Sequence, residues 1–264
     1  METVIIAIVL IVGGIAYAAY MFNKSGKAAL EIQYMQTTPI VDAMELIDSM
    51  TESDPNYHHY VELKGVLQSE EPVEAPFTER RVAYYKNRCY SVNEETRTER
   101  DSNGNTRTRV VKTENEISNE NSSTPVFLTD SSCDTRVYID LPSFGSDADY
   151  QSGCDRFEPE NSVWLQRNYS RYQWSHSGAR FLGYRLKEEV LNANQPVYVL
   201  GEMYRNGDRL YIGKSVVAKK PSKFSYKSED QLVSDTKNKK IMSLVLGGGA
   251  VLIGIILLIT YFVG

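Results

Sequence analysis

The stretch "QPVYVLGEMYRNGDRLYIGKSVV", Gln195 to Val217, predicts a β-hairpin. Apolar and polar residues alternate on both sides of its centre, and a period of two is typical of strands with one buried face. Asn206-Gly207 stands at the turn, where Asn-Gly supplies the positive φ angles that a tight hairpin needs. The middle of the chain is therefore expected to be rich in antiparallel strands.

Further β-rich runs precede this hairpin. "HHYVELKGVL" (58–67) and "RRVAYYKNRCYSV" (80–92) are joined by the proline-containing loop "SEEPVEAP" (69–76). Asn103-Gly104 predicts a second hairpin, whose charged arms we expect to project from the core as a solvated hairpin, with a recognition ribbon as the alternative. "PVFLTDSS" (125–132) and "TRVYIDLP" (135–142) are expected to form a half-buried antiparallel pair, with Val137, Ile139 and Leu141 on one face. Residues 143–161 resemble a loop.

Helical patterns lie on either side of the strands. In "TPIVDAMELIDSM" (38–50), Thr38 is a candidate N-cap and Pro39 a candidate first helical residue. Apolar residues then recur at helical spacing, at Ile40, Met44, Ile47 and Met50. We expect this apolar face to pack on the sheet, the alternative being a helix that binds a partner. "KFSYKSEDQLVSDTKNKKI" (223–241) predicts a short strand followed by a polar helix.

Two uncharged apolar runs, Val4 to Phe22 and Ile241 to Val263, bracket the chain. Each is long enough as a helix to cross a hydrocarbon core of about 30 Å. A secretory signal peptide would begin with Lys or Arg, whereas only Met1, Glu2 and Thr3 come before the first run. We therefore expect a retained anchor, with a cleaved signal as the alternative.

The expected organisation is a transmembrane helix in residues 1–23, a β-rich domain in residues 24–240 and a second transmembrane helix in residues 241–264. The fold class is α+β: a mainly antiparallel β domain with short helices, inserted between two transmembrane helices. Lysines near the spans all lie on the central side, at Lys24, Lys27, Lys237, Lys239 and Lys240. The bias of positive charge toward the cytoplasm predicts an integral, multi-pass membrane protein with a cytoplasmic central domain.

Composition limits the kinds of partner and cofactor. The net charge of −5 offers no basic field for nucleic acid, so no nucleic-acid partner is expected. Three cysteines and three histidines form no CxxC or HxxxH spacing, so we expect no metal and no cofactor. An odd number of cysteines favours reduced thiols in a reducing compartment, although one disulfide with a spare thiol is the alternative. No Gly-x-Ser-x-Gly turn of a serine hydrolase occurs.

One aromatic segment is a candidate interaction surface. "RYQWSH" (171–176) places Tyr172, Trp174 and His176 on one face of an extended chain, where they would form a groove for a ligand or peptide. Packing in the core or near the membrane is the alternative. His58 and His59 are adjacent on a predicted strand, so their side chains point to opposite faces and cannot both bind one metal.

Several of these fragments, in the same order, resemble the GIDE domain of mitochondrial and chloroplast membrane ubiquitin ligases, also called the beside-a-membrane domain. The segment 60–86 is similar to its opening strand, proline loop and paired aromatics, here Gly65, Pro76, Tyr84 and Tyr85. Pro125 to Asp130 matches its Pro-Phe-x-Leu-x-Asp element, with Val126 inserted. "KEEVLNANQPVYVLGE" (187–202) resembles its Glu-x-x-Leu and Val-Tyr-Val-x-Gly-Glu segments. Residues 219–235 resemble its closing strand and helix, although Tyr226 and Lys227 depart from the pattern.

The resemblance implies a β-rich domain held beside a bilayer and, in eukaryotic members, a RING finger after the second span. Gly264 stands where that RING would begin, and six Cys and His residues are too few for its eight ligands. We therefore expect a non-catalytic, membrane-tethered interaction or regulatory domain that has no RING within this sequence. The alternatives are the substrate-recognition subunit of a separately encoded ligase or protease, and an unrecognised hydrolase near His176. The expected partner is an unidentified membrane or cytoplasmic protein.

Overall fold

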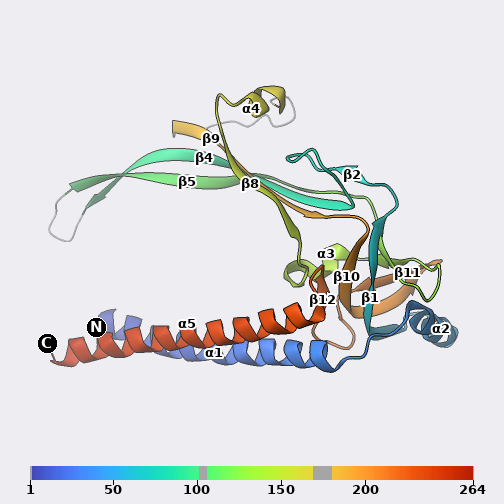
Figure 1. The fold of residues 1–264 in the computed structure, drawn as a ribbon. Coiled ribbons are helices and arrows are strands. Elements are labelled where there is room, and N and C mark those ends of the chain that lie inside the picture. The colour runs from blue at the N-terminus through green and yellow to red at the C-terminus, as the bar shows by residue number, and fades with distance from the viewer. Residues whose placement is uncertain (1, 101–105, 169–179, 264) are drawn as a thin grey trace. The chain divides into compact units, whose positions relative to one another are not determined.

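The computed structural model describes residues 2–100, 106–168 and 180–263, shown as ribbons in Figure 1. The chain divides into two compact units. The first comprises residues 1–65, 128–149 and 196–264, and the second comprises residues 66–127 and 150–195. Each unit is therefore assembled from segments that are distant in the sequence.

The first unit contains a β-barrel. Its sheet has the order β1-β6-β7-β11-β10-β12, and a further pairing between β1 and β10 closes a ring of five strands. Within the ring, β10 and β11 are antiparallel neighbours, whereas β7 and β11 are parallel neighbours. The strands are β1 (His58–Ser69), β6 (Val126–Thr129), β7 (Val137–Ile139), β10 (Gln195–Asn206), β11 (Arg209–Gly213) and β12 (Lys223–Ser225). The end of β1 from residue 66, the first two residues of β6 and the first residue of β10 fall within the second unit.

The order of the ring strands along the chain is first, second, third, fifth, fourth and back to the first. Together with the parallel pair formed by the third and fifth strands, this is the topology of the OB-fold, a five-stranded Greek-key barrel. The hairpin predicted around Asn206-Gly207 is confirmed as β10 and β11, with Asn206 paired to Arg209.

The close approach of two barrel strands requires a glycine. Gly65 lies where β1 approaches β6, and a Cβ at this position would be 2.3 Å from the carbonyl oxygen of Thr129. Only glycine fits there.

The expectation of a half-buried sheet at residues 137–141 is wrong, because Val137, Tyr138 and Ile139 are all buried. Both faces of β7 are covered, as is typical of a strand with a parallel neighbour.

The two longest helices, α1 (Glu2–Tyr34) and α5 (Glu229–Val263), also belong to the first unit and lie side by side (Figure 1). Both are long and apolar enough to cross a membrane. Neither helix stops at the end of its apolar run: α1 continues twelve residues past Phe22, and α5 starts twelve residues before Ile241. The predicted polar helix and the second apolar run are thus one helix.

The amphipathic helix α2 (Ile40–Thr51) is confirmed, but its N-terminus differs from the prediction. Pro39, and not Thr38, is the N-cap residue, and the helix begins at Ile40. The N–H of Ile40 donates to Asp130 Oδ2 at 2.9 Å and the N–H of Val41 donates to Ser132 Oγ at 3.1 Å. The buried face is formed by Ile40, Ala43 and Ile47, whereas Met50 is exposed. Two short turns complete the helices of this unit: α3 (Leu141–Phe144) and the 3-10 turn η1 (Gly145–Asp147).

The second unit is built on a four-stranded antiparallel sheet with the order β5-β4-β9-β8. Its strands are β4 (Tyr84–Arg100), β5 (Thr106–Asn121), β8 (Gln151–Pro159) and β9 (Arg180–Leu191), accompanied by the small pair β2 (Val73–Glu74) and β3 (Arg81–Val82) and by helix α4 (Val163–Asn168). The prediction of a loop over residues 143–161 is wrong for β8. This edge strand alternates between partly buried and exposed residues, so it lacks the apolar run that identifies central strands.

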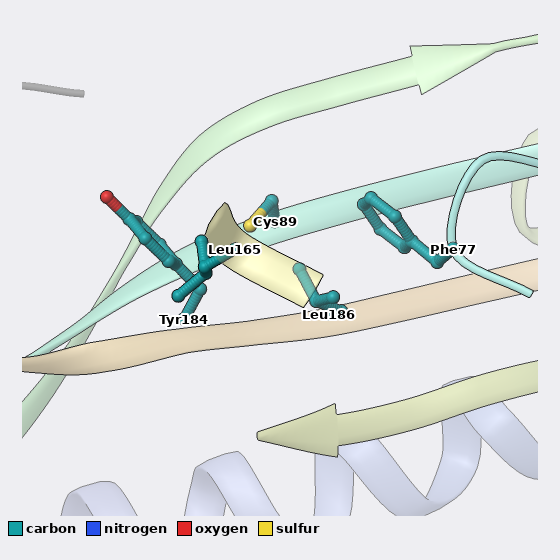
Figure 2. Close-up of a cluster of buried hydrophobic side chains, with 5 residues drawn as sticks. All are labelled: Phe77, Cys89, Leu165, Tyr184 and Leu186. Carbon is teal, nitrogen blue, oxygen red and sulfur yellow. The ribbon is translucent and has the colours of Figure 1, made fainter. Parts of the chain in front are cut away.

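The core of the second unit lies where β4 and β9 meet α4. Figure 2 shows Cys89, Tyr184 and Leu186 from these strands together with Leu165 of α4 and Phe77 of the loop between β2 and β3. The predicted charged hairpin is also confirmed: β4 and β5 pair as far as Arg100 and Thr106, and the outer ends of both arms are exposed. Its turn at Asn103-Gly104 lies outside the described residues.

Candidate functional site at the junction of helices and barrel

The residues that the sequence singled out do not form a site in the described part of the chain. Tyr172, Trp174 and His176 lie within residues 169–179, outside the described residues. His58 is stacked on Tyr204, while His59 lies beside Tyr57. Among the residues that the structure describes, no group of three or more His, Cys, Asp or Glu side chains could hold a metal ion.

Both long helices pack into the barrel at their polar ends. Ile32 of α1 and Leu232 of α5 form one buried cluster with Tyr198 and Leu200 of β10. Each of these side chains is at most 3% exposed. Met35, Tyr60 and Val233 pack around the cluster. The helices and the barrel thus share a hydrophobic core, which fixes their relative orientation.

A buried carboxylate reinforces this junction. Glu62 of β1 is fully buried, and it accepts hydrogen bonds from Thr37 Oγ1 at 2.6 Å and from the Tyr198 hydroxyl at 2.8 Å. Lys64 Nζ lies 3.2 Å from Glu62 and 2.6 Å from Glu229, the first residue of α5. Burial, followed by the charge of Glu62, raises the pKa of Tyr198 far above its usual range. The hydroxyl therefore remains a donor, and the network ties both helix ends to the barrel.

A second buried carboxylate, Glu202 of β10, holds the loop after β11. It accepts hydrogen bonds from Ser215 Oγ at 2.7 Å and from three successive backbone N–H groups, those of Val216, Val217 and Ala218, at 3.1, 3.1 and 2.6 Å. Burial alone would raise the pKa of Glu202, but the donors outweigh it and the pKa lies below its ordinary value. The loop is thus fixed by an ionised acceptor.

A row of stacked rings crosses the outer face of the barrel. Tyr204 of β10 is paired in register with Tyr211 of β11, which is paired with Tyr138 of β7. Ring centroids are 4.7 Å apart for His58 and Tyr204, 5.9 Å for Tyr204 and Tyr211, and 5.6 Å for Tyr211 and Tyr138. The guanidinium of Arg209 lies 4.6 Å from the Tyr138 ring. Tyr204 and Tyr211 are half-buried and Tyr138 is buried, so the exposed part of this aromatic row is formed by Tyr204 and Tyr211.

The second unit also has a buried carboxylate. Glu188 of β9 accepts hydrogen bonds from the N–H of Phe77 at 2.8 Å and from the hydroxyl of Thr78. The thiols nearby are not activated: burial raises the pKa of Cys89 to about 12 and that of Cys154 to about 11. Glu188 thus holds the loop at Phe77 and Thr78, whereas Cys89 lies in the core of this unit and Cys154 packs against it.

A model of the GIDE family, described as E3 ubiquitin ligase, matches residues 94–259, which is more than half of the chain. The chain belongs to the GIDE family. The resemblance seen in the sequence is confirmed. No curated protein matches the chain, and no solved structure matches it.

The GIDE motif acids have a common structural role. Asp130 ends the Pro-x-Phe-Leu element and caps α2, Glu188 begins the Glu-x-x-Leu element, and Glu202 ends the Gly-Glu element. Asp130 and Glu188 each accept a backbone N–H bond from a segment distant in the chain, and Glu202 accepts three from the loop after β11. Sequence reasoning did not assign these roles, although an acid inside an apolar run such as "VYVLGEMY" is the signal that would have identified Glu202.

Proposed function

We propose that this GIDE protein is a membrane-tethered interaction protein. In this proposal α1 and α5 cross the bilayer as an integral pair, and the barrel binds a membrane or cytoplasmic protein without catalysing a reaction itself. The apolar lengths of both helices and the family association with E3 ubiquitin ligases support it.

The observation that carries the proposal is the shared core of Ile32, Leu232, Tyr198 and Leu200. A domain joined to a bilayer by flexible linkers samples many orientations, whereas packing at both helix ends holds the barrel in one. A fixed height and facing raise the effective concentration of the barrel for partners in the same membrane. A freely diffusing substrate gains nothing from this arrangement.

The aromatic row supplies the proposed contact surface. Tyrosine side chains bring large contact area at low cost in conformational entropy, and they are enriched at protein interfaces. The test is cross-linking in native membranes, followed by purification of the full chain in mild detergent. We expect a specific partner with the wild type and a reduced yield with Tyr204→Ala/Tyr211→Ala, while Phe157→Ala, an exposed aromatic of the second unit, leaves the yield unchanged. Recovery of no specific partner contradicts the proposal.

The family description favours a second candidate: this chain recognises the substrate for a ligase or protease encoded separately. The same purification distinguishes the two, because this candidate requires a RING, ubiquitin-like or peptidase protein among the recovered partners.

The lysine distribution further supports a cytoplasmic central domain. Protease added to intact spheroplasts should then leave the domain uncut. Digestion of the domain would contradict the cytoplasmic orientation.

A further inference from the structure

A cavity of about 600 Å³ lies where α1 leaves its apolar run. One wall is a single face of α1, with Lys27, Leu30, Glu31 and Tyr34 at helical spacing. The opposite wall is the loop after β11, and the full lining is Lys27, Leu30, Glu31, Tyr34, Met35, Lys219, Lys220 and Pro221. Three lysines face one glutamate here, so the cavity combines positive charge with apolar side chains.

The loop wall is firmly held. The Glu202 carboxylate fixes its first half through Ser215 and three backbone N–H groups. Its second half is held by the Tyr60 hydroxyl, which donates to the carbonyl of Pro221 at 2.6 Å. Lys219 has a φ of +54°, a conformation that a residue with a side chain adopts at a cost. This local strain, together with the buried carboxylate, indicates that the position of the lysines is determined by the fold.

The charges in the cavity are only partly compensated. Lys220 Nζ lies 3.7 Å from Glu31 and 4.6 Å from the centre of the Tyr60 ring, and its side chain is still 46% exposed. The same loop exposes Val216 and Val217 by 68% and 67%. Exposed apolar side chains beside lysines combine apolar area with positive charge, the two contributions that strengthen binding at an anionic membrane surface.

The cavity lies at the height of lipid headgroups if α1 crosses the membrane. Lys27 is five residues beyond Phe22, which is a rise of about 7.5 Å along the helix. The headgroup region extends about 5–8 Å beyond the hydrocarbon on each side. We propose that this cavity binds the phosphate headgroup of an anionic phospholipid from the adjacent leaflet, with Lys27, Lys219 and Lys220 around the phosphate and Leu30 and Tyr34 against the apolar part. This inference rests on the proposed membrane insertion.

The test uses the full chain in nanodiscs that contain equal amounts of phosphatidylglycerol and phosphatidylcholine, and native mass spectrometry counts the lipids that stay bound. The wild type should retain phosphatidylglycerol preferentially. A lysine near an anionic surface contributes about fivefold in binding, so Lys219→Gln/Lys220→Gln should lower the ratio of the two retained lipids by at least about fivefold. Lys237→Gln/Lys239→Gln is the matched control, since it removes the same charge from α5 outside this cavity and so measures the general attraction of juxtamembrane lysines to an anionic leaflet; it should lower the ratio clearly less than Lys219→Gln/Lys220→Gln does.

Equal loss in both double variants, or no preference in the wild type, would overturn the inference. Glycerol phosphate added to the solution should displace no lipid, and displacement would identify a soluble phosphate as the ligand instead. The variants change exposed side chains, and an unchanged circular dichroism spectrum verifies their fold. Flotation of the full chain, reconstituted into vesicles and washed in high salt, tests membrane insertion separately. A chain that does not float refutes the proposed function. A chain that floats but shows no lipid preference in nanodiscs refutes only this inference.

Discussion

At Glu202, one carboxylate supports an entire loop. Four donors converge on its two oxygens, and a glutamine would present an N–H₂ group to some of them. Buried donors without acceptors cost about 1–3 kcal/mol each, so Glu202→Gln should lower the free energy of unfolding by about 2–4 kcal/mol. Urea titration of the protein in detergent measures this change. As a control, Glu95→Gln removes an exposed ion pair with Arg97 and should lower the free energy of unfolding by less than about 1 kcal/mol. Equal losses in the two variants would show that Glu202 does not hold the loop.

The pH dependence of stability follows from the lowered pKa of Glu202. A carboxyl group with a lowered folded-state pKa stabilises the fold above its unfolded pKa of 4.5, and this stabilisation is lost as the pH falls through the folded-state pKa. The melting temperature of the wild type should therefore drop between about pH 6 and pH 3. The drop should be smaller in Glu202→Gln, which has no carboxyl group to protonate. Parallel curves for the two proteins would remove Glu202 as the cause.

The three cysteines are free and differ in exposure, which gives a simple test of the fold. Cys89 is fully buried with a pKa of about 12, and Cys154 is partly buried with a pKa of about 11. Because the thiolate is the reactive form, we expect a maleimide at neutral pH to modify Cys133 first and Cys89 last. Peptide mass mapping after timed labelling measures the order. Early labelling of Cys89 would contradict the core drawn in Figure 2.

Among the elements, α1 and α5 contact one another through glycines. A Cβ on Gly247 would lie 2.6 Å from the Cβ of Ala18 and 2.7 Å from the carbonyl oxygen of Gly14, whereas nothing lies within 4 Å of a Cβ on Gly248. Small residues allow helices in lipid to approach closely. Gly247→Leu should separate the pair and lower the melting temperature in detergent by several degrees, while Gly248→Leu should leave it within about one degree. The reverse order would mean that the helices pack by other faces.

The elements that the sequence predicts are those with local signals. Asn206-Gly207 and the alternation around it specify β10 and β11, and uninterrupted apolar runs specify α1 and α5. The cap of α2 was mispredicted because its donor and acceptor, Ile40 and Asp130, are 90 residues apart. Strand β8 is not predicted because it lies at the edge of the sheet and none of its residues is fully buried, so its sequence contains no apolar run. Long-range contacts decide both cases.

For the whole molecule, the sequence predicts the class of fold and the family, but it does not predict the barrel. The ring depends on pairing β1 with β10 and β7 with β11, and neither pairing leaves a local pattern. The junction was missed for a similar reason: Glu62 and Tyr198 are 136 residues apart and meet only when the ring closes. The aromatic row of Tyr138, Tyr204 and Tyr211 likewise exists only because three strands are in register.

The central claim is that both long helices lie in lipid and hold the barrel against it. Extraction of native membranes with alkaline carbonate tests this claim most directly, because it strips peripheral proteins and leaves integral ones in the pellet. We predict that the full chain remains with the membrane, as expected for two apolar helices of this length. Release of the full chain into the supernatant would contradict the membrane tether and the function inferred from it.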